Sequence, residues 1–269
     1  MCRRILLAAH PETCVLTRMF WMNDGQVSTA KLYGDILVID VCENRNLYRM
    51  YLTTLIVING DNQARNVAYA LHDSQDTDTF AWILNNFENA WRSESDVLSK
   101  FNPVKAIFSD RDLAIRKAIQ LELPNAFHGL CLFHINENLR KNLFSKLGSS
   151  WIAFRARFWD TYRVGSESTF EEAWKELILR YPMASNYLSE YLYPCRAQWA
   201  WYSVGTHFCA GLRTTGSLEV EHKNFKLRAL SPNSTLNESF RILTNRANEQ
   251  ADQVFAIKLQ VQKPIMHIS

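Results

Sequence analysis

Short apolar runs and helical periods divide the chain into a region that mixes strands with helices and a second region that is helical. The first region contains five apolar or β-branched runs of strand length. These predicted strands cover residues 36–41, 51–58, 66–71, 106–108 and 126–132. The polar turn at residues 59–62 predicts that the second and third strands form a hairpin. Strands interrupted by helices predict an α/β fold with one mixed five-stranded sheet.

Helical periods fill the intervals between these strands and the second region. Apolar residues recur every three to four positions in residues 77–91 and 113–121. The pattern from 133 to 200 is wholly helical, and Ser168 with Glu171 has the spacing of a capping box. Many aromatic residues occur here, and we expect them to form the core of a helical subdomain rather than a surface that stacks on DNA bases.

Two more helices are predicted near the end of the chain. They cover residues 219–227 and 235–259, and the second opens with a capping box formed by Thr235 and Glu238. The helix-forming residues after position 25 predict a helical lead-in over 1–34.

Composition narrows the class of protein only slightly. The net charge of +3 is compatible with nucleic acid but is shared by many neutral enzymes. Six cysteines without a Cys-x-x-Cys pair indicate reduced thiols. The apolar stretch at residues 5–9 is too short for a signal peptide, and no run approaches the roughly 20 residues of a membrane span. We therefore expect a soluble intracellular protein.

Acidic residues follow two of the predicted strands. Asp40 ends one apolar run, and Asp110 and Asp112 follow another. Strand-end aspartates often cap a turn or a helix, and Asp112 is the better placed N-cap for the next helix. Asp110 is then free to bind a hard cation such as Mg²⁺, for which carboxylate oxygens are suited. Glu219, on a predicted helix, is a third candidate, although helix glutamates are mostly solvated.

A Cys-x-x-His pair, Cys131 and His134, lies where the last predicted strand meets a helix. A structural zinc site needs about four ligands, and Cys195, His207 and Cys209 lack motif spacing, so zinc is not expected. We expect Cys131 to pack in the interior and His134 to contact DNA or a catalytic neighbour.

The local sequences resemble one transposase family. The stretch KAIFSDRDLAIRKAIQLELPNAFHGLCLFHINENLRKNL and the later TTGSLEVEHKNFK are similar to Mutator-like element (MULE) transposases of the DDE type. The plant far-red-impaired-response type regulators, which descend from them, are also similar. The resemblance covers about residues 15–230, and it implies a ribonuclease-H-like fold.

This resemblance implies a division of the chain and a catalytic site. The implied parts are a helical lead-in (1–34), the first part of the ribonuclease-H-like core (35–140), a helical insertion (141–210) and returning helices (211–269). The implied catalytic and metal-binding residues are Asp40, Asp110 and Glu219. They would hold two Mg²⁺ ions, for which Mn²⁺ could substitute. Cys131, His134 and His222 would support them.

The resemblance also implies DNA as the partner. The reaction would be metal-dependent strand cleavage and strand transfer at transposon ends, by a nuclear homo-oligomer assembled on DNA. Basic side chains are candidates for phosphate contacts. They are Arg116, Lys117, Arg140, Lys141, Lys223, Lys226 and Arg228.

Two departures from the family pattern keep an alternative open. Val41 stands where the family usually has threonine after the first aspartate, and Ser217 stands two residues before Glu219, where arginine is usual. We also expect no zinc finger on either side of the core. The alternative function is that of a domesticated transcription regulator, which binds DNA without cleaving it.

Overall fold

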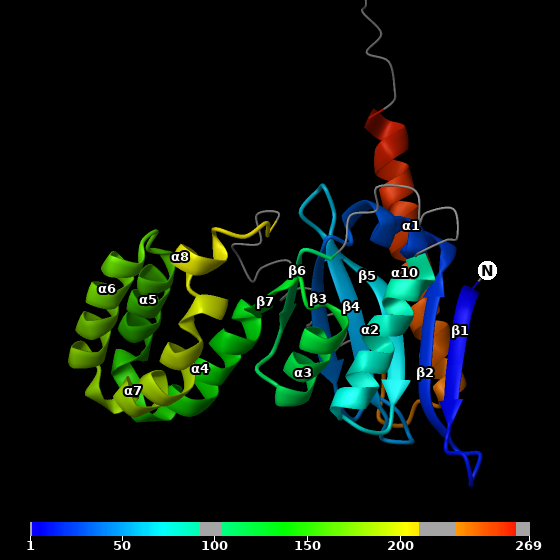
Figure 1. Cartoon of the computed structure of the whole chain (residues 1–269), viewed down its shortest axis with the longest axis horizontal. Helices are drawn as coiled ribbons and strands as arrows, with labels where there is room; N and C mark the ends of the chain where they lie inside the picture. The colour runs from blue at the N-terminus through cyan, green and yellow to red at the C-terminus, as the bar shows by residue number, and fades with distance from the viewer. Residues whose placement is uncertain (1, 92–103, 210–229, 262–269) are drawn as a thin grey trace, which may run out of the picture.

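The computed structural model describes residues 2–91, 104–209 and 230–261. Its centre is one seven-stranded mixed sheet with the order β1-β2-β5-β4-β3-β6-β7 (Figure 1). The strands are β1 (Cys2–Ala9), β2 (Leu16–Asn23), β3 (Ile36–Cys42), β4 (Tyr51–Ile58), β5 (Ala64–His72), β6 (Ala106–Ser109) and β7 (Phe127–Leu130). The mixed α/β class agrees with the sequence prediction.

The expected strand count and the helical lead-in were wrong. Two strands, β1 and β2, form an antiparallel pair before helix α1 (Asp24–Tyr33), so the lead-in is helical only in its last part. Strand β2 pairs with β5, which buries Phe20 and Trp21 completely. This pairing joins segments far apart in sequence, and such a contact overrides the weak local preference of a short apolar run.

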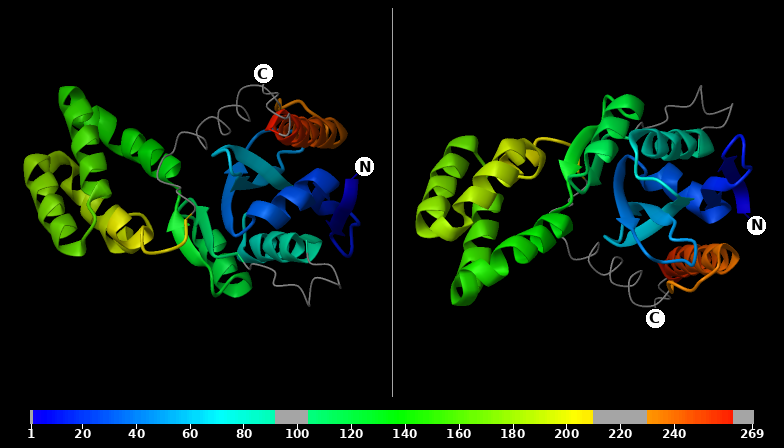
Figure 2. Two further views of the ribbon diagram at one scale, coloured as in Figure 1. Left: turned by 90° about the horizontal axis from the view of Figure 1, so that it is seen from above. Right: turned by 90° about the horizontal axis from the view of Figure 1, so that it is seen from below.

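Helices cover both faces of the sheet (Figures 1 and 2). Helices α2 (Thr77–Trp91) and α3 (Leu113–Glu122) pack on one face, where Leu37 and Ile39 of β3 enter the main apolar core. Helix α10 (Leu236–Val261) packs on the other face against Trp21. The predicted capping box starts α10, because the Glu238 amide donates to Thr235 Oγ1 and the Thr235 amide donates to Glu238.

A helical subdomain lies beyond the β7 edge of the sheet (Figure 1), as the periodicity predicts. It consists of α4 (Leu132–Leu147), a 3₁₀ turn η2 (Gly148–Ser150), α5 (Trp151–Arg163), α6 (Glu167–Arg180), α7 (Pro182–Tyr187), a π-helix η3 (Leu188–Leu192), a 3₁₀-helix η4 (Tyr193–Gln198) and α8 (Trp201–Val204). Most of its large aromatic side chains form a core of their own. Phe154, Phe158, Phe170 and Trp199 are almost completely buried, which confirms the interior role.

The cap of α6 differs from the prediction. The helix begins at Glu167, and the Ser166 hydroxyl accepts a hydrogen bond from the Thr169 amide. Ser168, which was expected to be the cap, is already inside the first turn, so its backbone is helical and it cannot act as N-cap.

Candidate functional site

Two of the expected acids lie near the ends of neighbouring strands: Asp40 is in β3, and Asp110 directly follows β6. Strands β3 and β6 run parallel, and Val38 pairs with Phe108. Asp40 and Asp110 each lie two positions further along, and side chains two apart point to the same face of a sheet. Val38 and Phe108 belong to one apolar cluster on that face. Continued one residue past the end of β6, this register puts Asp110 level with Asp40, and burial together with the negative charge of Asp40 raises the pKa of Asp110.

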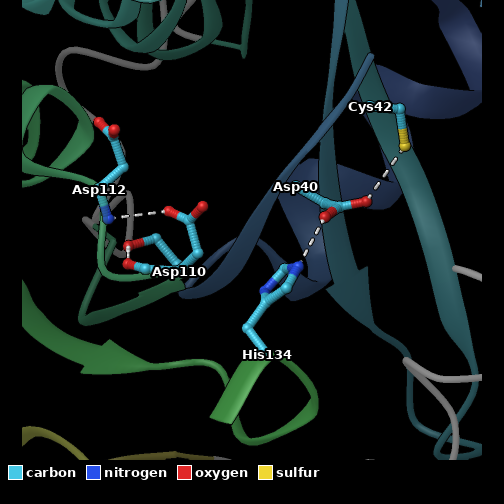
Figure 3. Close-up of polar contacts among 6 residues, drawn as sticks. Asp40, Cys42, Asp110, Asp112 and His134 are labelled. Carbon is cyan, nitrogen blue, oxygen red and sulfur yellow. Dashed lines mark hydrogen bonds and ion pairs between the residues drawn. The ribbon is translucent and has the colours of Figure 1, made fainter. Parts of the chain in front are cut away.

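Asp110 and Asp112 have different contacts (Figure 3). The Asp112 carboxylate accepts hydrogen bonds from the amides of Ala114 and Ile115 at 2.8 and 2.9 Å, so it is the N-cap of α3, as predicted. The Asp110 carboxylate accepts one hydrogen bond, from the Asp112 amide at 3.1 Å. Asp110 is thus held in place at one oxygen and is not required to cap the helix.

His134 comes from the first turn of α4 and contacts Asp40 directly. Its Nε2 lies 3.3 Å from Asp40 Oδ1, and the Cys42 thiol donates to Asp40 Oδ2 at 3.6 Å (Figure 3). Asp40 is only 5% exposed. Cys131, the residue before α4, is buried in the apolar cluster with Phe108. The cysteine therefore packs in the interior, and the histidine contacts the first of the expected acids.

The ionisation of the site is coupled. Burial on its own lowers the pKa of His134, but hydrogen bonds and negative charge from Asp40 and Cys131 outweigh burial and raise this pKa to about 10. Burial raises the pKa of Asp110, with smaller contributions from Asp112 and Asp40, while the Asp112 amide and His134 oppose the rise. His134 is consequently a cation at neutral pH, and it lies between two carboxylates that repel each other.

A cleft of about 500 Å³ opens beside these residues. Asp110 and Arg111 line it together with residues of α4, among them His134, and with residues of α7 and η3. Sequence reasoning missed Arg111 and Lys146, and it wrongly expected Tyr191, which is 49% exposed, to lie in the core. Their signal was present: Arg111 separates the two aspartates of the SDRD motif, and Lys146 is three helical turns beyond His134.

His128 of β7 stabilises the end of β6 that precedes Asp110. Its Nε2 lies 2.8 Å from the Ser109 hydroxyl, and Gln198 of the helical subdomain donates to its carbonyl oxygen at 3.3 Å. Burial, aided by the positive charge of Arg116, lowers the pKa of His128 to about 4. A neutral imidazole therefore fixes Ser109, the residue that precedes Asp110.

Several expected site residues lie outside the described part of the chain: Ser217, Glu219, His222, Lys223, Lys226 and Arg228. The convergence of Glu219 with the two aspartates thus stays a prediction. The other four basic candidates, Arg116, Lys117, Arg140 and Lys141, are all exposed, on α3 and α4. Within residues 2–91, 104–209 and 230–261, no three His, Cys, Asp or Glu side chains form a group that could hold a metal ion.

Comparison with known proteins agrees with this picture. Residues 36–138 match the MULE transposase domain, which confirms the resemblance seen in the SDRD and CLFH motifs. The chain is 27% identical to the putative protein FAR1-RELATED SEQUENCE 10 of Arabidopsis thaliana over 72% of its length and 27% of that relative. It is 24% identical to FAR1-RELATED SEQUENCE 4 of the same plant, over 91% of its length and 33% of that relative.

FAR1-RELATED SEQUENCE 11 of Arabidopsis thaliana is 21% identical over 75% of the chain and 28% of that relative. The chain thus spans about a quarter to a third of the length of these curated relatives. Across the described residues, no helix combines the length and apolar character needed to cross a membrane.

Proposed function

Because residues 36–138 match the MULE transposase domain, we propose that the chain is the core of a DDE-type DNA transposase, which cuts and joins DNA strands with the help of divalent metal ions. The observation that carries this proposal is the parallel pairing of β3 with β6, because Asp40 lies in β3, Asp110 directly follows β6, and the charge of Asp40 acts on Asp110. Glu219 is proposed as the third acid on the basis of the resemblance.

The strand arrangement supports a ribonuclease-H-like core. Strands β5, β4 and β3 are antiparallel neighbours, and β6 and β7 continue the sheet in parallel with β3. From β3 onward the chain runs strand, hairpin, helix, strand, helix, strand. The helical subdomain then occupies the proposed place of an insertion between the second acid and the third.

The donor set fits a hard divalent cation. Two carboxylates lie near each other on one face, and burial together with the charges of Asp112 and Asp40 raises the pKa of Asp110. A metal ion would reverse this, because positive charge favours the ionised form. Asp40 and Asp110 would hold such ions, and Glu219 would complete the set. When bound, they would activate an attacking water or 3′-hydroxyl and stabilise the leaving oxygen.

The other residues of the site position the acids and the substrate. His134 fixes one oxygen of Asp40 and offsets part of the negative charge at the site. Arg111, next to the acids and exposed, is placed to contact a phosphate. Arg116, Lys117, Arg140 and Lys141 would attract the DNA backbone more broadly. We infer that several copies assemble on nuclear DNA, as transposition at two ends requires.

One observation favours the rival function, a regulator that binds DNA without cutting it. Both oxygens of Asp40 already have protein partners, His134 and Cys42. A carboxylate held in this way can serve as a structural contact that links the sheet to the helical subdomain. The similarity to FAR1-RELATED SEQUENCE proteins also favours the regulator. The sequence resembles the far-red-impaired-response type regulators, which descend from transposases.

A nicking assay separates the two functions. Supercoiled plasmid is incubated with the chain in Mg²⁺ or Mn²⁺, and the formation of nicked circles is measured. Asp110→Asn should abolish nicking and leave DNA binding nearly intact, because asparagine keeps the shape but loses the charge that a hard cation needs. Asp160→Asn, at an exposed acid on α5, is the matched control and should nick normally. An intact chain that binds DNA but never nicks it supports the regulator.

A further inference from the structure

One face of helix α4 carries a row of polar side chains into the cleft. His134, Asn138, Asn142 and Lys146 follow one another at intervals of four, and all four line the cleft. Residues four apart lie above one another on a helix. The row therefore runs from the acids at one end of α4 to a lysine at the other. Charge and amide groups in such a row suit a ligand with phosphates and hydrogen-bonding edges.

The facing wall presents an aromatic side chain that is not part of the core. Tyr191 is 49% exposed and stacks on Tyr187, with ring centroids 5.2 Å apart and planes inclined by 21°. The guanidinium carbon of Arg111 lies 5.5 Å from the centre of the Tyr191 ring. In contrast, Phe154, Phe158 and other large rings of the subdomain are buried. Tyr191 is thus open to a ligand and lies beside a cation.

The backbone under Tyr191 is unusual. Residues Leu188–Leu192 form a π-helix between α7 and the following 3₁₀-helix. Such segments are rare and occur frequently at functional sites, because the wider turn redirects side chains. Here the π-helix buries Leu188, while Glu190 and Tyr191 are exposed and line the cleft.

The size of the cleft limits what can enter. A volume of about 500 Å³ is typical of a small-molecule site and is far too small to enclose a DNA duplex. A single nucleotide is a ligand of the size that such a site binds. Proteins recognise an unstacked nucleotide with an aromatic ring that contacts the base, cations that contact the phosphates and polar groups that bind the base edge. Glu190 adds an acceptor for an exocyclic amino group.

We propose that this cleft receives one nucleotide turned out of the duplex beside the strand to be cut. Its base would lie against Tyr191, its edge would face Asn138 and Asn142, and its phosphates would contact Arg111 and Lys146. The inference rests on the proposed function in taking DNA as the ligand. It adds that the ligand is an unpaired nucleotide and that the helical subdomain, not the sheet, selects it.

Binding measured without metal tests this inference. Fluorescence anisotropy in EDTA compares two labelled duplexes of one sequence, fully paired and with a single unpaired nucleotide. The chain should bind the second about tenfold more tightly, the effect of stacking one base. Tyr191→Ala should remove the preference and Tyr191→Phe should keep it. Tyr48→Ala, at an exposed tyrosine between β3 and β4, is the matched control and should change nothing.

Each result has one meaning. Equal affinity for the two duplexes, or a preference that survives Tyr191→Ala, overturns the inference. A preference for the unpaired nucleotide that depends on Tyr191, in a chain that never nicks plasmid, upholds it and overturns strand cleavage. Nicking without any preference for the unpaired nucleotide upholds strand cleavage and overturns this inference. A chain that binds neither duplex overturns both. Circular dichroism of each variant checks folding, and since Tyr191 is half exposed its replacement should not disturb the core.

Discussion

His134 Nε2 lies 3.3 Å from Asp40 Oδ1, and this contact joins the helical subdomain to the centre of the sheet (Figure 3). His134 belongs to the first turn of α4, and Asp40 belongs to β3. A protonated imidazole beside a buried carboxylate offsets its charge, so neither group is left alone in the interior. The pair thus orients one expected catalytic acid and fixes the angle at which α4 leaves β7.

Removal of one member of this pair should destabilise the fold. His134→Ala leaves the Asp40 carboxylate buried without its cation, and the free energy of unfolding should fall by about 3 kcal/mol. Urea unfolding near pH 7 measures this loss. The double variant Asp40→Asn with His134→Gln replaces the ion pair by a neutral amide pair and should recover much of the stability. If the losses of Asp40→Asn alone and of His134→Gln alone simply add in the double variant, the residues are not coupled.

Stability should pass through a maximum near pH 6.5. The pKa of His134 is raised from 6.5 to about 10, so its contribution is fully present below pH 6.5 and is lost as the pH rises through 10. Burial lowers the pKa of His72 and His128 from 6.5 to about 4, so stability also falls as the pH drops from 6.5 to 4.

Melting temperatures from pH 4 to pH 10 check this curve. His134→Gln should flatten its alkaline side, because the only group removed is the one that loses its proton there. His128→Gln should flatten its acid side and leave the alkaline side unchanged. A curve that keeps rising toward pH 10 in the unaltered chain would contradict the ionised pair.

Asp110→Asn should stabilise the metal-free chain while it removes cleavage. The pKa of Asp110 is raised by burial and by its acidic neighbours, so its ionised form destabilises the fold at every pH above its ordinary value of 3.8. Asparagine carries no charge and can still accept the hydrogen bond from the Asp112 amide. Melting in EDTA at pH 7 should show a higher midpoint for the variant.

In saturating Mg²⁺ the unaltered chain should melt at a higher temperature than Asp110→Asn, which is the opposite of the result in EDTA. The metal would bind the folded unaltered chain and stabilise it by mass action, whereas the variant would gain little. Asp160→Asn is again the matched control and should melt like the unaltered chain with and without the metal, since Asp160 is exposed. A variant less stable than the unaltered chain in EDTA would mean that Asp110 has a structural role.

The sequence was most informative where local chemistry decides the structure. Buried strands such as β3 and β4 are continuous apolar runs, and Asp112 caps α3 because its carboxylate reaches amides two and three residues ahead. The capping box at Thr235 is equally local. For the same reason the chain position of Asp110, just after a strand, indicated a residue free for another role.

Contacts between distant segments were beyond that reasoning. Strand β2 forms because it pairs with the edge of β5, and the sequence of residues 16–23 alone does not indicate this pairing. The contact of His134 with Asp40 depends on the parallel pairing of β3 with β6 and on the exit angle of α4. Helical periodicity could not distinguish Tyr191 from the buried aromatic residues, because Tyr191 lies inside a π-helix, whose wider turn departs from the α-helical period.

Gly129 should be essential for the edge that carries Asp110. It pairs with Phe108 in the parallel β6–β7 ladder, and a Cβ on Gly129 would lie 2.3 Å from Phe108 Cε1. Phe108 packs edge-to-face on Phe127 and belongs to the apolar cluster with Cys131, so it has little room to move. Gly129→Ala should lower the unfolding free energy by about 1–3 kcal/mol.

The same change should reduce nicking more than an equal loss of stability elsewhere, because Phe108 lies two residues before Asp110 on the same strand end. Gly165→Ala is the matched control: no atom lies within 4 Å of its added methyl group, so stability should stay level or rise slightly. Phe108→Leu combined with Gly129→Ala should restore much of the stability, since a smaller side chain relieves the overlap. Urea unfolding of these three variants and the unaltered chain tests the prediction. A Gly129→Ala chain as stable as the Gly165→Ala chain would show that β6 and β7 can separate without cost.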